Sequence, residues 1–205
     1  PRVILRAGLH LFDHNTLRRR ITQQLDRFEA GWGAAPDHVD GHQHVHQLPQ
    51  VRRVLLDTLE ARYPDVARRP WLRASRAPRE AALPLRRKAN VISWLGADEL
   101  QHDATRRGWQ SNRHLLGVYG FDTDVPGYRA LLQRWLALAQ DGDLLMCHPA
   151  RHAPASDVIG AARQVEWAVW QSDTLRDDLA QAGVRVTALR SVLAERSSSA
   201  ASGGA

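Results

Sequence analysis

The sequence predicts an α/β fold organised around a mostly parallel sheet. Short apolar runs rich in β-forming residues alternate with segments whose apolar residues recur at helical spacing, which is the pattern of successive βα units. About five such units can be counted along the 205 residues, whereas a closed (β/α) barrel has eight. We therefore expect an α/β sheet that is incomplete.

In the first half of the chain, predicted strands and helices follow one another closely. Leu17, Ile21, Leu25 and Phe28 recur at the spacing of one helix face, ahead of a glycine-containing turn at residues 31–33. Pro49 suits the first turn of the next helix, because a backbone N–H would go unpaired there. The predicted elements are a strand over 3–11, a helix over 17–30, a strand over 38–45, a helix from 49 and a strand over 71–75.

The second half begins with an irregular stretch, residues 76–125, which we expect to hold one or two helices inside long loops. Regular alternation then returns, with a helix over 126–140, a strand over 143–147, a helix over 158–181 and a strand over 184–188. Residues 197–205 contain only Ser, Ala and Gly and are predicted to form a disordered tail. Residues 1–196 are accordingly expected to form a single domain.

Composition excludes several classes of protein. No apolar run approaches membrane-spanning length, and the first residues lack the apolar core of a secretion signal. The single cysteine, Cys147, excludes an internal disulfide and a zinc site built from several cysteines. We therefore expect a protein of the reducing cytoplasm.

The charge is strongly basic, with 28 Lys and Arg against 22 Asp and Glu and a net charge of +6. All the basic residues except Lys88 are arginines, and they are scattered along the chain. A nucleic-acid-binding domain would gather them on one face among stacking aromatic residues. We therefore expect a solvated arginine-rich surface and no nucleic-acid partner, and keep a nucleic-acid-binding domain as an alternative that salt-dependent DNA affinity would reveal.

The most informative segment is residues 38–46, which begins with the strand predicted over 38–45. On a strand, alternate side chains point to the same face, and here every second residue is His or Asp: His38, Asp40, His42, His44 and His46. Neutral imidazole is the commonest protein ligand of divalent metals, and a nearby carboxylate can orient it. The pattern favours a polar active-site strand over buried histidines that are hydrogen-bonded without a metal.

Two other histidines follow predicted strands directly. His10 ends the first apolar run, and His148 follows the run at 144–147 and precedes Pro149. The carboxyl ends of parallel strands form the active face of α/β folds. The two histidines and the segment around His42 are therefore expected to meet there.

Three segments together resemble the YdjC family, also called ChbG/HpnK: AGLHL at residues 7–11, HVDGHQHVHQLP at 38–49 and MCHPA at 146–150. Their order matches that of the family, as does a later helix that carries Arg163 and Glu166. The resemblance covers the chain from about residue 8 to residue 189. Family members are metal-dependent carbohydrate deacetylases, and they include the chito-oligosaccharide deacetylases.

The resemblance implies a (β/α) barrel-like deacetylase fold that here lacks its first βα units. It also implies a divalent ion, Mg²⁺ or Zn²⁺, held by His10 and His42. His148 is the expected catalytic residue that polarises the carbonyl or protonates the amine, and Asp40 assists it by orienting ligands. Substrate binding is expected from His44, His46 and Arg73, the last on the strand predicted at 71–75. The substrate would be an N-acetylated amino sugar, from a chito-oligosaccharide or a hopanoid-linked glycan, and a homodimer is left open.

The sequence departs from the family in one respect. Members carry an Ala-Asp-Asp-Phe-Gly motif, about fifty residues before the segment matched by His10, which supplies a metal ligand and the general base. Here that motif is absent, so the chain is either truncated or degenerate, and by itself should release little or no acetate. Asp13 could replace the missing acid, but as a helix N-terminal residue it is better explained as a cap.

Two other functional classes compete with the deacetylase. A non-catalytic sugar- or metal-binding member of the same family would lack the base and would bind without turnover. A hydrolase with a Ser or Cys nucleophile is the weakest alternative, because no G-x-S-x-G elbow exists and Cys147 lies within an apolar run.

Overall fold

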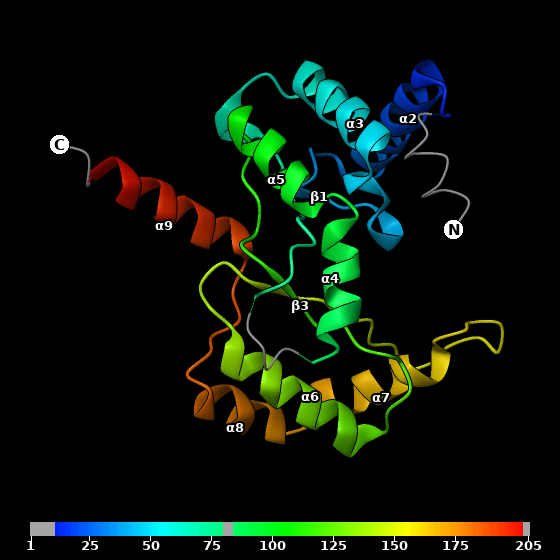
Figure 1. The fold of residues 1–205 in the computed structure, drawn as a ribbon, viewed down its shortest axis with the longest axis vertical. Coiled ribbons are helices and arrows are strands. Elements are labelled where there is room, and N and C mark those ends of the chain that lie inside the picture. The colour runs from blue at the N-terminus through cyan, green and yellow to red at the C-terminus, as the bar shows by residue number, and fades with distance from the viewer. Residues whose placement is uncertain (1–10, 80–83, 203–205) are drawn as a thin grey trace. The chain divides into compact units, whose positions relative to one another are not determined.

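A computed structural model describes residues 11–79 and 84–202, with side chains up to residue 196. The described part is a mixture of many helices and very short strands (Figure 1). It divides into two compact units, which are described separately below. Unit 1 comprises residues 11–76, 91–112 and 193–202, and unit 2 comprises the described parts of 77–90 and 113–192.

Unit 1 is built on a pair of packed helices (Figure 1). Helix α2, His14–Trp32, begins where the Asp13 carboxylate accepts a hydrogen bond from the Thr16 N–H at 2.7 Å, and it ends at Gly33 with φ of 76°. The cap explanation of Asp13 is therefore confirmed. Helix α3, Pro49–Arg62, begins at the expected proline.

The core of unit 1 lies between these helices and a short parallel sheet. Its buried apolar residues form one cluster: Leu25, Leu55, Leu56, Leu59, Leu72, Ala104 and Trp109. Helix α5, Ala97–Arg106, contributes Ala104, and strand β2, Trp71–Leu72, contributes Leu72. A 3₁₀ turn, Val66–Arg68, precedes β2.

Three extended segments lie side by side in unit 1. Strand β1, His38–Val39, pairs in parallel with β2 in the register His38 to Trp71. A further parallel bridge joins Leu72 to Ser111. The sheet therefore places the residues after β1 beside those after β2, which is where the predicted site residues Asp40 and Arg73 lie.

Unit 2 contains a second parallel pair and three helices that pack on one another (Figure 1). Strand β3, Leu115–Leu116, pairs with β4, Leu144–Leu145. Tyr128, Leu132 and Trp135 are completely buried on α6. The helices are α6, Val125–Leu138, α7, Gly160–Trp170, and α8, Thr174–Gln181.

Two helices remain. Helix α4, Arg86–Trp94, lies with α5 in the stretch predicted to hold one or two helices among loops. Helix α9, Leu189–Ser202, runs through much of the segment where the sequence predicted a tail. In the described parts of the chain, no helix is long and apolar enough to span a membrane.

The α/β class is confirmed. The strands predicted over 71–75 and 143–147 are each shorter, at two residues, as β2 and β4. Three other predicted elements also need correction. The strand predicted over 38–45 ends at Val39. The helix predicted over 158–181 is two helices. Helix α7 ends at Trp170, where the Ser172 hydroxyl donates to the Val169 carbonyl at 2.7 Å, and α8 begins at Thr174. Residues 184–188 form no strand: they have no strand partner among the described residues, and Val186 is 69% exposed.

Two other expectations stay predictions. The strand over 3–11 falls almost entirely outside the described residues. The described strands form two separate two-stranded sheets, and the barrel that the resemblance implies is not tested by them.

The core predicts the effect of shortening Leu56, which has no exposed surface on α3. We expect Leu56→Ala to lower the free energy of unfolding by about 2–5 kcal/mol, because it leaves a cavity between α3 and its neighbours. Leu11→Ala is the control, since Leu11 is 57% exposed. Urea denaturation followed by circular dichroism measures both, and equal effects would contradict the assigned core.

Candidate functional site

The histidine-rich segment after β1 is a tight 3₁₀ loop, His42–Gln47. Gln43 and His44 adopt left-handed backbone conformations, with φ of 51° and 63°. Alternation of side chains therefore stops after Asp40, and the predicted common face of the histidines is wrong. His42 is exposed, His44 is half-buried and His46 is buried.

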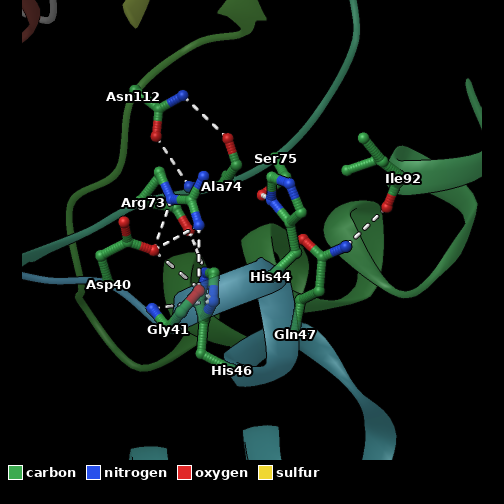
Figure 2. Close-up of polar contacts among 10 residues, drawn as sticks. All are labelled: Asp40, Gly41, His44, His46, Gln47, Arg73, Ala74, Ser75, Ile92 and Asn112. Carbon is green, nitrogen blue, oxygen red and sulfur yellow. Dashed lines mark hydrogen bonds and ion pairs between the residues drawn. The ribbon is translucent and has the colours of Figure 1, made fainter. Parts of the chain in front are cut away.

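His46 holds this loop in place through hydrogen bonds at both of its ring nitrogens. Only 3% of its surface is exposed. Its Nδ1 accepts a hydrogen bond from the Gly41 N–H at 3.1 Å, and its Nε2 lies 2.6 Å from the Arg73 carbonyl oxygen (Figure 2). Because a carbonyl only accepts, Nε2 must carry the proton. His46 is therefore a neutral Nε2–H imidazole that joins the loop to the segment after β2.

Gly41 allows the loop to close over His46. A Cβ atom at residue 41 would lie 2.7 Å from both the Cβ and the backbone nitrogen of His46. The φ of Gly41 is −109°, which any residue can adopt. The glycine is required here for space, and not for backbone freedom.

Arg73 binds Asp40, the acidic residue predicted to assist catalysis. Its Nε donates to Oδ1 of Asp40 at 2.5 Å, a terminal nitrogen forms an ion pair with the same oxygen, and it also donates to the Gly41 carbonyl at 3.1 Å. Arg73 is 8% exposed, whereas the side chain of Asp40 is 42% exposed. Burial lowers the pKa of Arg73, and the Asp40 carboxylate opposes that effect. Its guanidinium thus orients Asp40 at the surface.

Other polar residues complete this network, and the sequence alone did not indicate them. Nδ1 of His44 lies 2.7 Å from the Ser75 hydroxyl. The Asn112 side chain forms two hydrogen bonds with the backbone of Ala74, at 2.7 and 2.9 Å (Figure 2). No motif marks Ser75 or Asn112, because their role depends on the pairing of distant segments.

Gln47 anchors the end of the loop. It is completely buried, and its amide donates to the Ile92 carbonyl at 2.5 Å. Gly96 packs against the Gln47 carbonyl so closely that a Cβ could not be accommodated. The last turn of the loop is thereby held to the end of α4 and the start of α5.

His42 differs from its neighbours because its exposed ring makes no hydrogen bond within the described residues. Such an uncommitted imidazole can accept a metal ion. Among residues 11–79 and 84–196, however, no group of three or more His, Cys, Asp or Glu side chains is arranged to hold one. His10, the other predicted ligand, lies outside the described residues.

His148 belongs to unit 2, just after β4. Its backbone N–H donates to Oε2 of Glu166, and its Nδ1 lies 3.6 Å from Oε1 of that carboxylate. Glu166 on α7 is completely buried and also accepts a hydrogen bond from the Tyr119 hydroxyl at 2.6 Å. The side chain of His148 is 27% exposed.

Cys147, next to His148, is not suited to act as a nucleophile. Burial, and then the charge of Glu166, raise the pKa of its thiol to about 11. The reactive thiolate is therefore a minor species at neutral pH. This result is consistent with the low rank of a cysteine hydrolase in the sequence analysis.

The predicted residues that the structure describes belong to both units, and the expectation that His148 meets the segment around His42 stays a prediction. Asp40, His42, His44, His46 and Arg73 lie around one loop of unit 1. His148 lies in unit 2 with Glu166 and Tyr119. Tyr119 was not predicted, and no sequence pattern distinguishes it.

Comparison with known proteins identifies the relatives of this chain. The family model described as YdjC-like protein matches residues 4–181. Proteins named chitooligosaccharide deacetylase from Yersinia pestis (strain Pestoides F) and from Yersinia pseudotuberculosis serotype O:1b (strain IP 31758) are each 30% identical over 184 residues. The alignment covers 88% of this chain but only 62% of each relative. No solved structure gives a significant match.

The role of Gly41 can be tested by a single methyl group. We expect Gly41→Ala to lower the free energy of unfolding by about 1–3 kcal/mol, because the methyl would displace His46 in a well-packed site. Gly31→Ala is the matched control: it lies within α2 with no neighbour inside 4 Å, and Ala is favoured over Gly in a helix. Urea denaturation measures the free energy of unfolding of both variants. An unchanged stability of Gly41→Ala would contradict the close packing of Gly41 against His46.

His46 should make stability depend on pH. Burial, together with the charge of Arg73, lowers the pKa of His46 from 6.5, so the unfolded chain binds a proton that the folded chain does not. The contribution of the buried neutral His46 to the free energy of unfolding is fully present above about pH 6.5 and is lost as the pH falls below that value. We expect a loss of up to about 1.4 kcal/mol per pH unit below that value.

Thermal unfolding between about pH 7.5 and pH 5.5 measures this dependence. His46→Gln should remove most of the slope, whereas His102→Gln should leave it, because His102 is exposed on α5. Equal slopes in the parent and in His46→Gln would show that other groups cause the dependence.

Proposed function

Because the chain belongs to the YdjC-like family, we propose that it takes part in the hydrolytic removal of acetyl groups from amino sugars of the chito-oligosaccharide type. The observation that carries the proposal is the match of residues 4–181 to the family, which includes both histidine motifs that the structure describes. The 30% identity to proteins named chitooligosaccharide deacetylase supports the substrate class. The chain spans about three fifths of the length of those relatives.

His10 and His42 would hold a divalent ion in this proposal. The exposed and uncommitted ring of His42 fits that role. When bound, such an ion polarises an acyl carbonyl and lowers the pKa of a coordinated water. The other histidines of the loop are less available, since both ring nitrogens of His46 already have partners.

The network behind His42 would present the loop to the substrate. The buried Arg73 guanidinium holds Asp40 at the surface, where its carboxylate can accept a hydrogen bond from a sugar hydroxyl or from a ligand imidazole. We infer that Arg73 and His46 act by positioning, and that His44 is the loop residue that contacts the sugar.

The reaction is hydrolysis of an amide. Water adds to the acetyl carbon, the C–N bond breaks, acetate leaves, and the departing amine takes up a proton. His148 is our candidate for the donor of that proton, because part of its ring is exposed beside a buried carboxylate. The base that accepts the water proton is expected from the Asp-Asp motif that this sequence lacks.

A non-catalytic sugar- or metal-binding role within the same family is the second candidate. It shares the substrate class with the deacetylase and differs only in turnover. The same assay therefore distinguishes the two.

Acetate release from N-acetylglucosamine oligomers tests the proposal, with Mg²⁺ or Zn²⁺ added. It is measured for the chain alone and for the chain preceded by the N-terminal segment of a Yersinia relative, where the resemblance to the family places the Asp-Asp motif. We expect release from the extended protein and little from the chain alone. His42→Ala should reduce release by roughly 100-fold or more, the scale of one lost catalytic contribution.

His102→Ala provides the matched control, because it removes an exposed histidine on α5 of unit 1 that is not among the predicted site residues. It should release acetate at close to the parental rate. Binding of the oligomers by the extended protein without any release would favour the non-catalytic candidate. An extended protein that neither binds the oligomers nor releases acetate from them would show that the proposed sugar substrate is wrong.

A further inference from the structure

Glu166 is a buried carboxylate whose only ion-pair partner among the described residues is His148. None of its side chain is exposed, and neither an arginine nor a lysine of the described chain pairs with it. Arg163, one helical turn earlier on α7, binds Asp157 and the His148 carbonyl instead. Because an unpaired buried charge is strongly unfavourable, the Glu166 carboxylate depends on its contacts with Tyr119 and His148.

Two donors bind the two oxygens of this carboxylate, and a ring nitrogen of His148 lies close by. The Tyr119 hydroxyl donates to Oε1 at 2.6 Å, and the His148 backbone N–H donates to Oε2. Nδ1 of His148 lies 3.6 Å from Oε1, beyond hydrogen-bond distance, and this buried nitrogen has no hydrogen-bond partner in the described chain. Burial raises the pKa of Glu166, but its contacts with His148 and Tyr119 more than offset this and lower it, so the group stays ionised.

The surroundings limit how the His148 ring can turn. The Arg163 guanidinium donates to the His148 carbonyl at 3.1 Å and so holds the backbone. The Phe121 ring meets the imidazole edge-on, with 5.4 Å between centroids, and Lys88 lies over the Phe121 ring. Nδ1 thus faces the carboxylate inside unit 2.

We propose that Glu166 is a positioning residue that holds His148 in its Nδ1–H form, with Nε2 free to exchange a proton with the substrate. Its importance for catalysis rests on the function proposed above. A carboxylate favours a proton on the nitrogen that faces it, so the neutral ring keeps Nδ1–H. The second proton, on Nε2, is then the one that His148 gives to the departing amine.

Replacement of Glu166 by glutamine tests this assignment. The amide offers a single acceptor oxygen, and its NH₂ group would face a donor of Tyr119 or His148. Imidazole in water prefers the Nε2–H form, so the loss of the carboxylate should move His148 away from Nδ1–H. The tautomer can be read by long-range ¹H–¹⁵N correlation of the 205-residue chain in alkaline buffer. The signals of His148 are identified by their absence in His148→Gln.

We expect Nδ1–H in the parent and a mixed or Nε2–H ring in Glu166→Gln. Asp178→Asn is the matched control, because Asp178 is also a buried carboxylate of unit 2 but binds Arg129 and Gln133. It should leave the His148 tautomer unchanged. An Nε2–H ring in the parent, an unchanged tautomer in Glu166→Gln or the same change in Asp178→Asn would overturn the proposal.

Two further variants keep the test decisive. Tyr119→Phe should retain Nδ1–H, because it removes only a competing donor to Oε1. Glu166→Asp keeps the charge but withdraws it from Nδ1 by one methylene, and it should weaken the Nδ1–H preference even if Glu166→Gln does not fold. A His148 tautomer that changes in Tyr119→Phe but not in the Glu166 variants would contradict the assignment.

Activity separates this inference from the proposed function. In the extended protein, Glu166→Gln should lower acetate release by about 10–100-fold, as expected when the partner of a functional histidine is lost. If the parent releases no acetate, the proposed function fails, while the tautomer still decides the role of Glu166. If acetate is released and the tautomer does not change in Glu166→Gln, the positioning role alone is wrong.

Discussion

The hydrogen bond from Nε2 of His46 to the Arg73 carbonyl is the contact on which the geometry of unit 1 depends most directly. It joins the loop after β1 to the segment after β2 at a depth where water cannot replace a lost partner, so both polar groups must be paired. The same ring accepts from Gly41, and Arg73 in turn binds Asp40. Two residues buried beneath the surface thus determine where an exposed histidine and an exposed acid are presented.

Unit 2 follows the same physical rule with a different residue type. A buried carboxylate, Glu166, is surrounded by donors from Tyr119 and His148. In both units the partly exposed polar residue is held by a buried partner that cannot relax without leaving a polar group unpaired. Precise placement of a reactive side chain requires this kind of support, because an unsupported surface side chain samples several rotamers.

Helices were more predictable than strands in this chain, for a local reason. The apolar spacing of Leu17 to Phe28 and the proline at 49 located α2 and α3, since helical hydrogen bonds lie within each segment. Strands need partners from elsewhere, so the alternation at 38–46 and at 184–188 predicted strands that the chain does not form at those lengths. At 41–46, ring-to-backbone bonds of His46 and left-handed residues replace the extended conformation.

The sequence by itself determined the α/β class, the family motifs and the residue types of the candidate site, because these depend on local composition and order. Only the tertiary structure decided which histidines remain available. His42, His44 and His46 are equivalent in the sequence pattern, yet one is exposed, one contacts Ser75 and one is buried against Arg73. Those differences arise from partners about thirty residues away in the chain, and no pattern within nine residues can contain them.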